Sequence, residues 1–236
     1  MCLFSYDVSM QAVILAAGRG TRMKNLTETV PKPLLVVAGK NLLEHKLDNL
    51  PQSIDEVIIV IGIQGEKIQQ YFKDHYRHFS IRYSKQNSQQ GTADALWQAQ
   101  SLLTDDFIVM AGDDIYGASI LQNVINTKWS MAVWSCDSWP QPYNNLVINE
   151  SGYLEKIIFE VENYQGAGYI DMCLYHLSSD IFNYSPIRIF GTKEFGLPHT
   201  ISEVTKKIPL KVIEGDFWLQ INTPEDLKKA DTILSS

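Results

Sequence analysis

The chain has 236 residues, of which 45% are hydrophobic, and its formal net charge is −7. This length supplies one sizeable core, and the acidic balance argues against nucleic-acid binding through a broad basic face. The longest apolar run, near residues 57–61, is far shorter than the roughly 20 residues that a membrane span needs.

The N-terminal stretch and the cysteines favour a cytoplasmic location. The first nine residues contain no cationic segment and no long apolar segment, so they do not predict a secretory signal, and translation starts at either Met1 or Met10. Cys2, Cys136 and Cys173 are too far apart to predict a disulfide framework or a zinc site. We expect reduced thiols in a single unit that spans residues 1–236.

Strand-like runs alternate with helical patterns in the first half of the chain. The runs are continuously apolar, which is typical of strands that are buried on both faces of a parallel sheet. The expected strands are 11–16, 56–61, 80–84 and 106–111, and the expected helices are 41–50, 65–72 and 92–103. This order predicts a Rossmann-like, doubly wound α/β fold with a mixed, mostly parallel sheet. Loops 17–32 and 112–114 then lie on the rim where such folds bind ligands.

The second half of the chain predicts a small β-rich, lid-like lobe. Segments 143–148 and 153–158 flank a turn sequence and predict a hairpin, and 168–177 predicts another strand. Helices are expected over 199–207 and 223–234. The second of these begins with Thr223, Pro224 and two acids, a favourable helix start.

A loop rich in glycine and arginine, LAAGRGTRM, follows the first expected strand. A dinucleotide fingerprint needs a third glycine where this chain has Met23, and a P-loop needs Gly-Lys-Ser/Thr, so both are excluded. The cations of the region outnumber its acids: Arg19, Arg22, Lys24 and Lys32 face only Glu28. This local charge favours a triphosphate over a merely solvated loop.

Two prolines stiffen the backbone on either side of Lys32. A lysine that is aimed at a phosphate benefits from such a base, whereas an ordinary surface lysine does not need one. The order LAAGRGTRM…PKPLLVVAGKNLLEH resembles the signature of the sugar-1-phosphate nucleotidylyltransferases, and the likeness weakens between about residues 131 and 195. Its motifs are most similar to those of N-acetylglucosamine-1-phosphate uridylyltransferases and glucose-1-phosphate thymidylyltransferases.

The resemblance implies a reaction and a fold. Members of the family join a nucleoside triphosphate to a sugar 1-phosphate and release pyrophosphate. A GT-A-like fold is implied, in which residues 10–115 bind the nucleotide and residues 116–236 form the sugar-phosphate lobe and the C-terminal helix. Arg22 and Lys32 are the implied catalytic residues: Arg22 lies near the leaving pyrophosphate, and Lys32 near the α-phosphate and the incoming sugar phosphate. The implied contacts to base and ribose are Leu15, Ala16, Ala17, Gly18, Arg19, Gly20 and Thr21.

A second polar stretch, QNSQQGTADA from Gln86, suggests a base pocket. A glutamine amide offers a donor and an acceptor that match one edge of uracil or thymine. Gly91 lets the backbone approach the base, and Thr92 starts a helix. The spacing of Gln86 and Gln89 is similar to that of uridylyltransferases whose two glutamines face uracil. We therefore expect UTP, then dTTP; a CTP pocket or an ordinary polar loop are the alternatives.

Asp113 follows a strand and a glycine, and a carboxylate there suits Mg²⁺, which prefers oxygen ligands. The resemblance makes Asp113 a metal ligand, with Asp114 as the fallback, and Mg²⁺ the expected cofactor. Many relatives read W-x-D-I-G-T near the C-terminus, where this chain has Gln220 at the aspartate position. We expect Asn222 to be the second ligand, with Gln220 as the fallback.

The sugar side is less well defined by the sequence. The resemblance suggests Asn144, Glu160 and Asp171 as contacts to the sugar phosphate, although the flanking residues depart from the family pattern and ordinary lobe surface is the alternative. An anionic Asp171 accepts hydrogen bonds from hydroxyls but donates none to an N-acetyl carbonyl, which favours a plain hexose or a polyol. The sugar therefore stays open.

The expected mechanism is in-line attack by a sugar phosphate oxygen on the α-phosphate, without a protein nucleophile. One alternative is a cytidylyltransferase that acts on phosphocholine or inositol phosphate. Another is a non-catalytic nucleotide-binding homologue, suggested by Gln220. No hexapeptide repeat follows the domain, so we do not expect the acetyltransferase half of bifunctional relatives. The expected partners are the two substrates, with neither nucleic acid nor membrane, and the sequence does not predict an oligomeric state.

Overall fold

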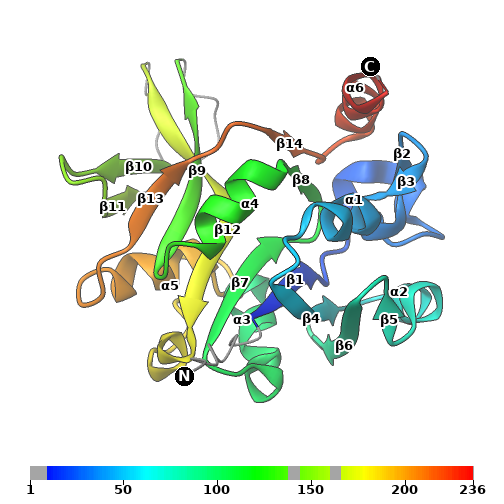
Figure 1. The fold of residues 1–236 in the computed structure, drawn as a ribbon, viewed down its shortest axis with the longest axis horizontal. Helices are drawn as coiled ribbons and strands as arrows, with labels where there is room; N and C mark the ends of the chain where they lie inside the picture. Colours follow the sequence, from blue (N-terminus) through cyan, green and yellow to red (C-terminus); the bar gives the residue numbers. More distant parts are fainter. Residues whose placement is uncertain (1–9, 138–143, 160–165, 236) are drawn as a thin grey trace, which may run out of the picture.

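The computed structural model describes residues 10–137, 144–159 and 166–235. Within these residues, eight strands form one central sheet in the order β13-β9-β12-β7-β1-β4-β6-β5 (Figure 1). Strands β7, β1, β4 and β6 run parallel, whereas β12 is antiparallel to both β7 and β9. The predicted α/β fold with a mixed, mostly parallel sheet is therefore confirmed.

The bounds of the four predicted core strands agree closely with the structure. In spatial order the strands of the sheet are β13 (Lys211–Glu214), β9 (Ser130–Cys136), β12 (Gly168–Ser178), β7 (Asp106–Ala111), β1 (Met10–Ala16), β4 (Ile54–Ile61), β6 (Phe79–Lys85) and β5 (His75–Tyr76). Alternate residues of β1 enter different cores: Ala12 and Ile14 pack on one face, and Val13 on the other. This two-sided burial explains why the strand sequences are continuously apolar.

Helices cover both faces of the sheet. They are α1 (Leu42–Asn49), α2 (Gly65–Phe72), α3 (Gly91–Gln98), α4 (Ala118–Ile125), α5 (Leu197–Val204) and α6 (Pro224–Leu234). Buried residues of α1, α2 and α4 share one core, and those of α3 and α5 share the other. Short 3₁₀ turns lie at η1 (Thr21–Thr27), η2 (Lys32–Leu34), η3 (Gln100–Leu102) and η4 (Ser179–Asn183).

Helix α5 begins two residues earlier than predicted, because Pro198 occupies its first turn, and it ends at Val204. Helix α3 ends at Gln98, where η3 replaces the predicted continuation to residue 103. Helix α6 has the predicted start: Thr223 and Asp226 form a capping box.

Three strands of the second half continue the central sheet beyond β7. Strand β12 is hydrogen-bonded to β7, and β9 and β13 extend the sheet beyond it. The predicted hairpin is present as β10 (Asn145–Ile148) and β11 (Leu154–Ile158). Two further short pairs are β8 (Asp114–Tyr116) with β14 (Trp218–Gln220) and β2 (Val36–Val37) with β3 (Lys40–Asn41).

The carboxyl ends of β1 and β7 lie side by side and form the rim of the site. The Gly112 amide donates to the Leu15 carbonyl at 3.0 Å. A Cβ atom at Gly112 would lie 2.6 Å from that oxygen, so this close approach requires glycine.

No helix among the described residues is long and apolar enough to cross a membrane. Cys136 and Cys173 are free thiols, and Cys2 lies outside the described residues.

Candidate active site

A cleft of about 520 Å³ opens at this rim and gathers most of the predicted site. The predicted residues that line it are Leu15, Ala16, Ala17, Gly18, Arg19, Gly20, Thr21, Arg22, Lys32, Gln86, Gln89, Gly91, Thr92, Asp113 and Asn222. Among the described residues, Asn144, Asp171 and Gln220 are not part of this lining. Glu160 lies outside the described residues. The sequence did not indicate Cys173, Ile189 or Glu194, which complete the walls.

The two glycines of the loop have different roles. A Cβ atom at Gly18 would meet no atom within 4 Å, so this position leaves open space in the cleft. Gly20 has a φ of 63°, and a Cβ atom there would lie 3.0 Å from the Cβ of Lys32. Gly20 therefore lets the loop turn against the stem of Lys32, while Gly18 leaves room for a ligand.

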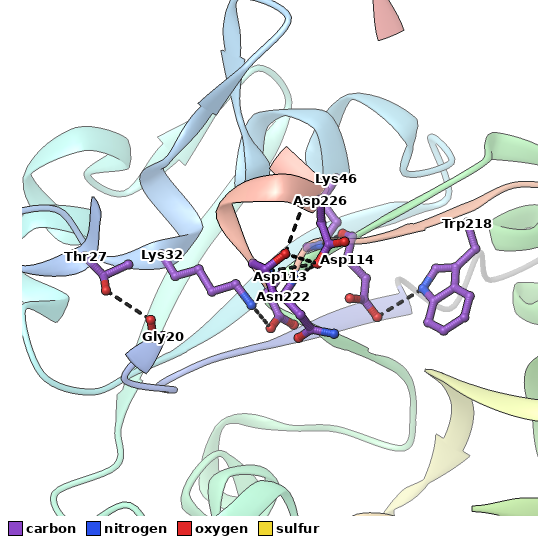
Figure 2. Close-up of polar contacts among 10 residues, drawn as sticks. Gly20, Thr27, Lys32, Lys46, Asp113, Asp114, Trp218, Asn222 and Asp226 are labelled. Carbon is purple, nitrogen blue, oxygen red and sulfur yellow. Dashed lines mark hydrogen bonds and ion pairs between the residues drawn. The ribbon is translucent and has the colours of Figure 1, made fainter. Parts of the chain in front are cut away.

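Lys32 and Asp113 form the central ion pair of the cleft. The Lys32 Nζ lies 2.5 Å from the Asp113 Oδ2, and only 6% of the lysine side chain is exposed (Figure 2). Pro31 and Pro33 flank Lys32 at the start of η2, as the sequence suggested. The pair connects the glycine-loop side of the cleft to the end of β7.

Beneath this pair lie two buried residues in contact, Lys46 and Asp114, a contact that sequence reasoning missed. Lys46 on α1 is 1% exposed, and its ammonium donates to the Asp114 backbone carbonyl. The indole of Trp218 donates to the Asp114 carboxylate at 3.1 Å. Burial lowers the pKa of Lys46 and raises that of Asp114, although each charge partly opposes the other's shift. The sequence does place this lysine between Leu43 and Leu47 on the buried face of α1, and that position could have indicated a buried lysine.

The cations of the glycine loop divide between two hollows. Lys24 and Glu28 line a neighbouring hollow together with Gly18, Arg19 and Thr21, but they do not line the cleft. Among the described residues that line the cleft, three are cations, Arg19, Arg22 and Lys32, and two are carboxylates, Asp113 and Glu194. The positive excess at the cleft is thus smaller than the loop sequence alone suggested.

The loop from Gln86 to Gly91 is hydrogen-bonded to the glycine loop and to the segment before α5. The Gln89 amide donates to the Ala17 carbonyl at 2.7 Å and accepts from Arg19 Nε. Gly91 has a φ of 94°, and a Cβ atom there would lie 2.4 Å from the Phe195 carbonyl oxygen. The Thr92 hydroxyl accepts from the Leu197 amide at 2.9 Å. Gly91 and Thr92 therefore also hold the wall that carries Ile189 and Glu194.

Asp171 stabilises an irregularity in β12, next to the cleft. The pairing of β12 with β9 breaks between Asp171 and Tyr175, and Cys173 there has a φ of 52°. The Asp171 carboxylate accepts from the Cys173 amide at 2.7 Å and from the Tyr175 hydroxyl. Both carboxylate oxygens thus bind the strand itself, which positions Cys173 at the cleft wall.

Two oxygen donors at the rim, one after β7 and one after β14, are of the kind that holds a magnesium ion. Figure 2 shows the side chain of Asn222 beside the Asp113 carboxylate, and both line the cleft. Among the described residues, no cluster of three or more His, Cys, Asp or Glu side chains is suited to hold a metal. Mg²⁺ usually keeps several waters and is shared with substrate phosphates, so one carboxylate and one amide suffice on the protein side.

Removal of Lys46 should strongly destabilise the fold. Lys46→Met removes the donor to the buried Asp114 carbonyl and the positive charge that most favours the ionised Asp114 carboxyl. Leaving a buried polar group without its partner in this way costs about 1–3 kcal/mol. The double variant Lys46→Met/Asp114→Asn should recover only part of that loss, because it removes the carboxyl charge but leaves the backbone carbonyl of residue 114 without its donor. Urea denaturation of the three proteins measures the difference; a loss below about 1 kcal/mol in the single variant would contradict the role of the pair.

The stability contributed by Asp171 should depend on pH. Burial raises the pKa of Asp171 from 3.8 to about 6, against the hydrogen bonds from Tyr175 and Cys173. The folded protein thus binds this proton more tightly, so the contribution is complete below about pH 4 and is lost as the pH rises through about 6.

The variant Asp171→Asn does not titrate and provides the reference. The free energy of unfolding of the wild type, relative to that of this variant, should fall between about pH 4.5 and about pH 7.5. Urea denaturation at both pH values measures it, and a constant difference would show that the pKa of Asp171 is not raised.

Comparison with known proteins identifies the family. The family model described as nucleotidyl transferase matches residues 11–231. The Bifunctional protein GlmU of Methanococcus maripaludis (strain C5) is 30% identical over 231 residues, which cover 94% of this chain and 54% of that protein. The D-glycero-alpha-D-manno-heptose 1-phosphate guanylyltransferase of Campylobacter jejuni is 29% identical over 220 residues, 92% of this chain and 96% of that protein.

Solved structures show the same fold. A putative glucose-1-phosphate thymidylyltransferase from Bacillus anthracis matches with a TM-score of 0.82 at 21% sequence identity, over 97% of this chain and 96% of that one. The chain spans about half the length of the GlmU proteins that it matches. The family match extends over the glycine loop, Lys32, Asp113 and Asn222, and the chain belongs to the nucleotidyl transferase family.

Proposed function

We propose that the protein joins a nucleoside triphosphate to a sugar 1-phosphate and releases pyrophosphate. The observation that carries this proposal is the convergence, in one cleft, of the open glycine loop with Lys32, Asp113 and Asn222. The space beside Gly18 suits a nucleotide, and the cations suit its phosphates. Among relatives, a heptose 1-phosphate guanylyltransferase aligns over nearly its whole length.

The proposed reaction is an in-line displacement at the α-phosphorus. An oxygen of the sugar phosphate forms the new P–O bond, and the bond between the α-phosphorus and the α,β-bridging oxygen breaks. The electron pair of that bond leaves with pyrophosphate. The attacking phosphate is already an anion, so the protein need only position the reactants and stabilise the developing charge. Arg22 contacts the leaving pyrophosphate, and Lys32 the α-phosphate and the sugar phosphate.

Charge in the cleft supports a need for a divalent cation. A triphosphate carries about four negative charges, whereas the cleft has three cations and two carboxylates. Asp113 and Asn222 would hold Mg²⁺, which neutralises phosphate charge when bound. In the present structure the Asp113 carboxylate is paired with the Lys32 ammonium. In the proposed complex, Lys32 leaves Asp113 and binds the phosphates.

For the nucleotide we propose UTP or dTTP, and we propose that the Gln86 side chain forms a hydrogen bond with the base. For the acceptor we propose a sugar 1-phosphate without naming the sugar. Asn144 and Glu160 remain candidate contacts. The direct role of Asp171 is the hydrogen bonding within β12, so we propose that it affects the acceptor side through the position of Cys173.

The experiment that tests the function is pyrophosphate release from UTP, dTTP, CTP, GTP and ATP with a panel of phosphorylated sugars, phosphocholine and inositol phosphate, with and without Mg²⁺. Magnesium-dependent release with UTP or dTTP and a sugar 1-phosphate is the expected result. Release confined to CTP with a non-sugar acceptor would favour a cytidylyltransferase. Saturable nucleotide binding without release from any pair would favour a non-catalytic homologue.

Replacement of Lys32 should abolish turnover. Lys32→Ala removes the ammonium that contacts the reacting phosphates, so kcat should fall at least about 100-fold. Lys40→Ala is the matched control, because Lys40 also lies 2.5 Å from a carboxylate, that of Asp48, but at an exposed site outside the cleft lining. Normal pyrophosphate release by a folded Lys32→Ala protein would overturn the assignment.

A further inference from the structure

We propose that Asp94 determines which base the cleft accepts by fixing the orientation of the Gln86 side-chain amide. With that amide fixed, the cleft presents an oxygen, and it selects a base whose ring nitrogen carries a hydrogen. Uracil, thymine and guanine have such a nitrogen at the edge concerned, whereas cytosine and adenine have an acceptor there. This inference rests on the proposed nucleotide-binding role of the cleft.

Two hydrogen bonds hold the Gln86 amide. Its Nε2 atom donates to the Asp94 Oδ2 at 2.7 Å and to the Gly91 carbonyl oxygen at 3.0 Å. Both partners are oxygen acceptors. An amide turned over by 180° would place its own oxygen against these two oxygens, which is repulsive, so the assignment of nitrogen and oxygen follows from the chemistry.

The surroundings of Gln86 prevent it from relaxing into another position. Its side chain is 5% exposed, and its backbone amide donates to the Ile61 carbonyl at 2.9 Å. Asp94 lies in the first turn of α3, where the positive helix end stabilises a carboxylate. The other oxygen of Asp94 accepts from Gln98 at 3.3 Å. Gln98 thus contacts a different oxygen of Asp94 from the one that holds Gln86.

The Oε1 atom is what Gln86 can offer to a ligand in the cleft. No hydrogen bond to this atom is present in the part of the chain that the structure describes, and Gln86 lines the cleft. The other glutamine of the motif differs, because the Gln89 amide already binds Ala17 and Arg19 on both sides. Base selection therefore depends on the fixed acceptor of Gln86 and not on two adaptable amides.

A fixed acceptor discriminates sharply between bases of the same size. The uracil N3–H can donate to Oε1, whereas the cytosine N3 would meet it with a lone pair. A site that is built around such a hydrogen bond rejects an analogue that cannot form it, because a buried polar group is left without its partner. We expect UTP to bind at least about 100-fold more tightly than CTP.

Equilibrium binding without an acceptor sugar tests this inference separately from turnover. The triphosphate pairs are UTP against CTP and GTP against ATP, measured by titration calorimetry with Mg²⁺. In each pair that binds, the nucleotide with the ring N–H should bind more tightly. In Asp94→Asn the new amide can donate to Gln86, which permits the turned-over orientation, so the affinity ratio of UTP to CTP should fall at least about tenfold.

Two further variants make the test specific. Gln98→Ala is the matched control: it removes the other neighbour of the Asp94 carboxylate and should leave the ratio unchanged. Gln86→Leu removes the side-chain amide that accepts from the base, so the ratio of its affinities for UTP and CTP should approach one. This variant keeps the inference testable if Asp94→Asn does not fold. An unchanged ratio in folded Asp94→Asn, or tighter binding of CTP by the wild type, would overturn the inference.

Failure of this inference and failure of the proposed function give different results. Tighter binding of UTP without pyrophosphate release from any acceptor would support the role of Asp94 and contradict the proposed reaction. Pyrophosphate release with CTP as the better substrate, and no effect of Asp94→Asn on the affinity ratio, would contradict the role of Asp94 and leave the reaction intact.

Discussion

The ion pair between Lys32 and Asp113 is the contact on which the cleft depends. It joins the proline-bracketed turn to the end of β7 at 2.5 Å, and Gly20 leaves the space through which the stem of Lys32 passes. The lysine compensates the charge of the Asp113 carboxylate, which also interacts with the buried Lys46. The same lysine and the same carboxylate are the groups that our proposal assigns to phosphate and metal, so the pair must open for the reaction.

Buried charges beneath the cleft restrict how that opening can occur. Lys46 donates to the backbone of Asp114, and Trp218 donates to its carboxylate, so the residue that follows Asp113 is held on two sides. Strand β14 pairs with β8 at this point and places Asn222 at the rim. The contacts of Asp114 thus restrain the chain next to Asp113, which suits the role that the proposed function gives to its carboxylate.

The parts of the structure that local patterns determine were predictable, and the parts that depend on tertiary context were not. Strand β7 and helix α2 have the predicted bounds, because a doubly buried strand and an amphipathic helix both leave a periodic signal. Strands β9 and β13 were not predicted, since nothing local shows that they extend the sheet past β12. In the site, motif residues converge as expected, whereas Cys173 and Glu194 reach the cleft, and Lys46 lies beneath it, through packing alone. Asp94 stands in the motif that begins at Gln86, but its hydrogen bond to the Gln86 amide, on which its proposed role rests, is visible only in the structure.

The most direct test of the account is a crystal structure of the protein with Mg²⁺ and a non-hydrolysable triphosphate. We predict that the Lys32 ammonium leaves Asp113 and contacts a phosphate oxygen, while Asp113 and Asn222 bind the metal and Gln86 Oε1 accepts from the base. A triphosphate bound outside the cleft, or bound within it while Lys32 remains paired with Asp113, would contradict the account.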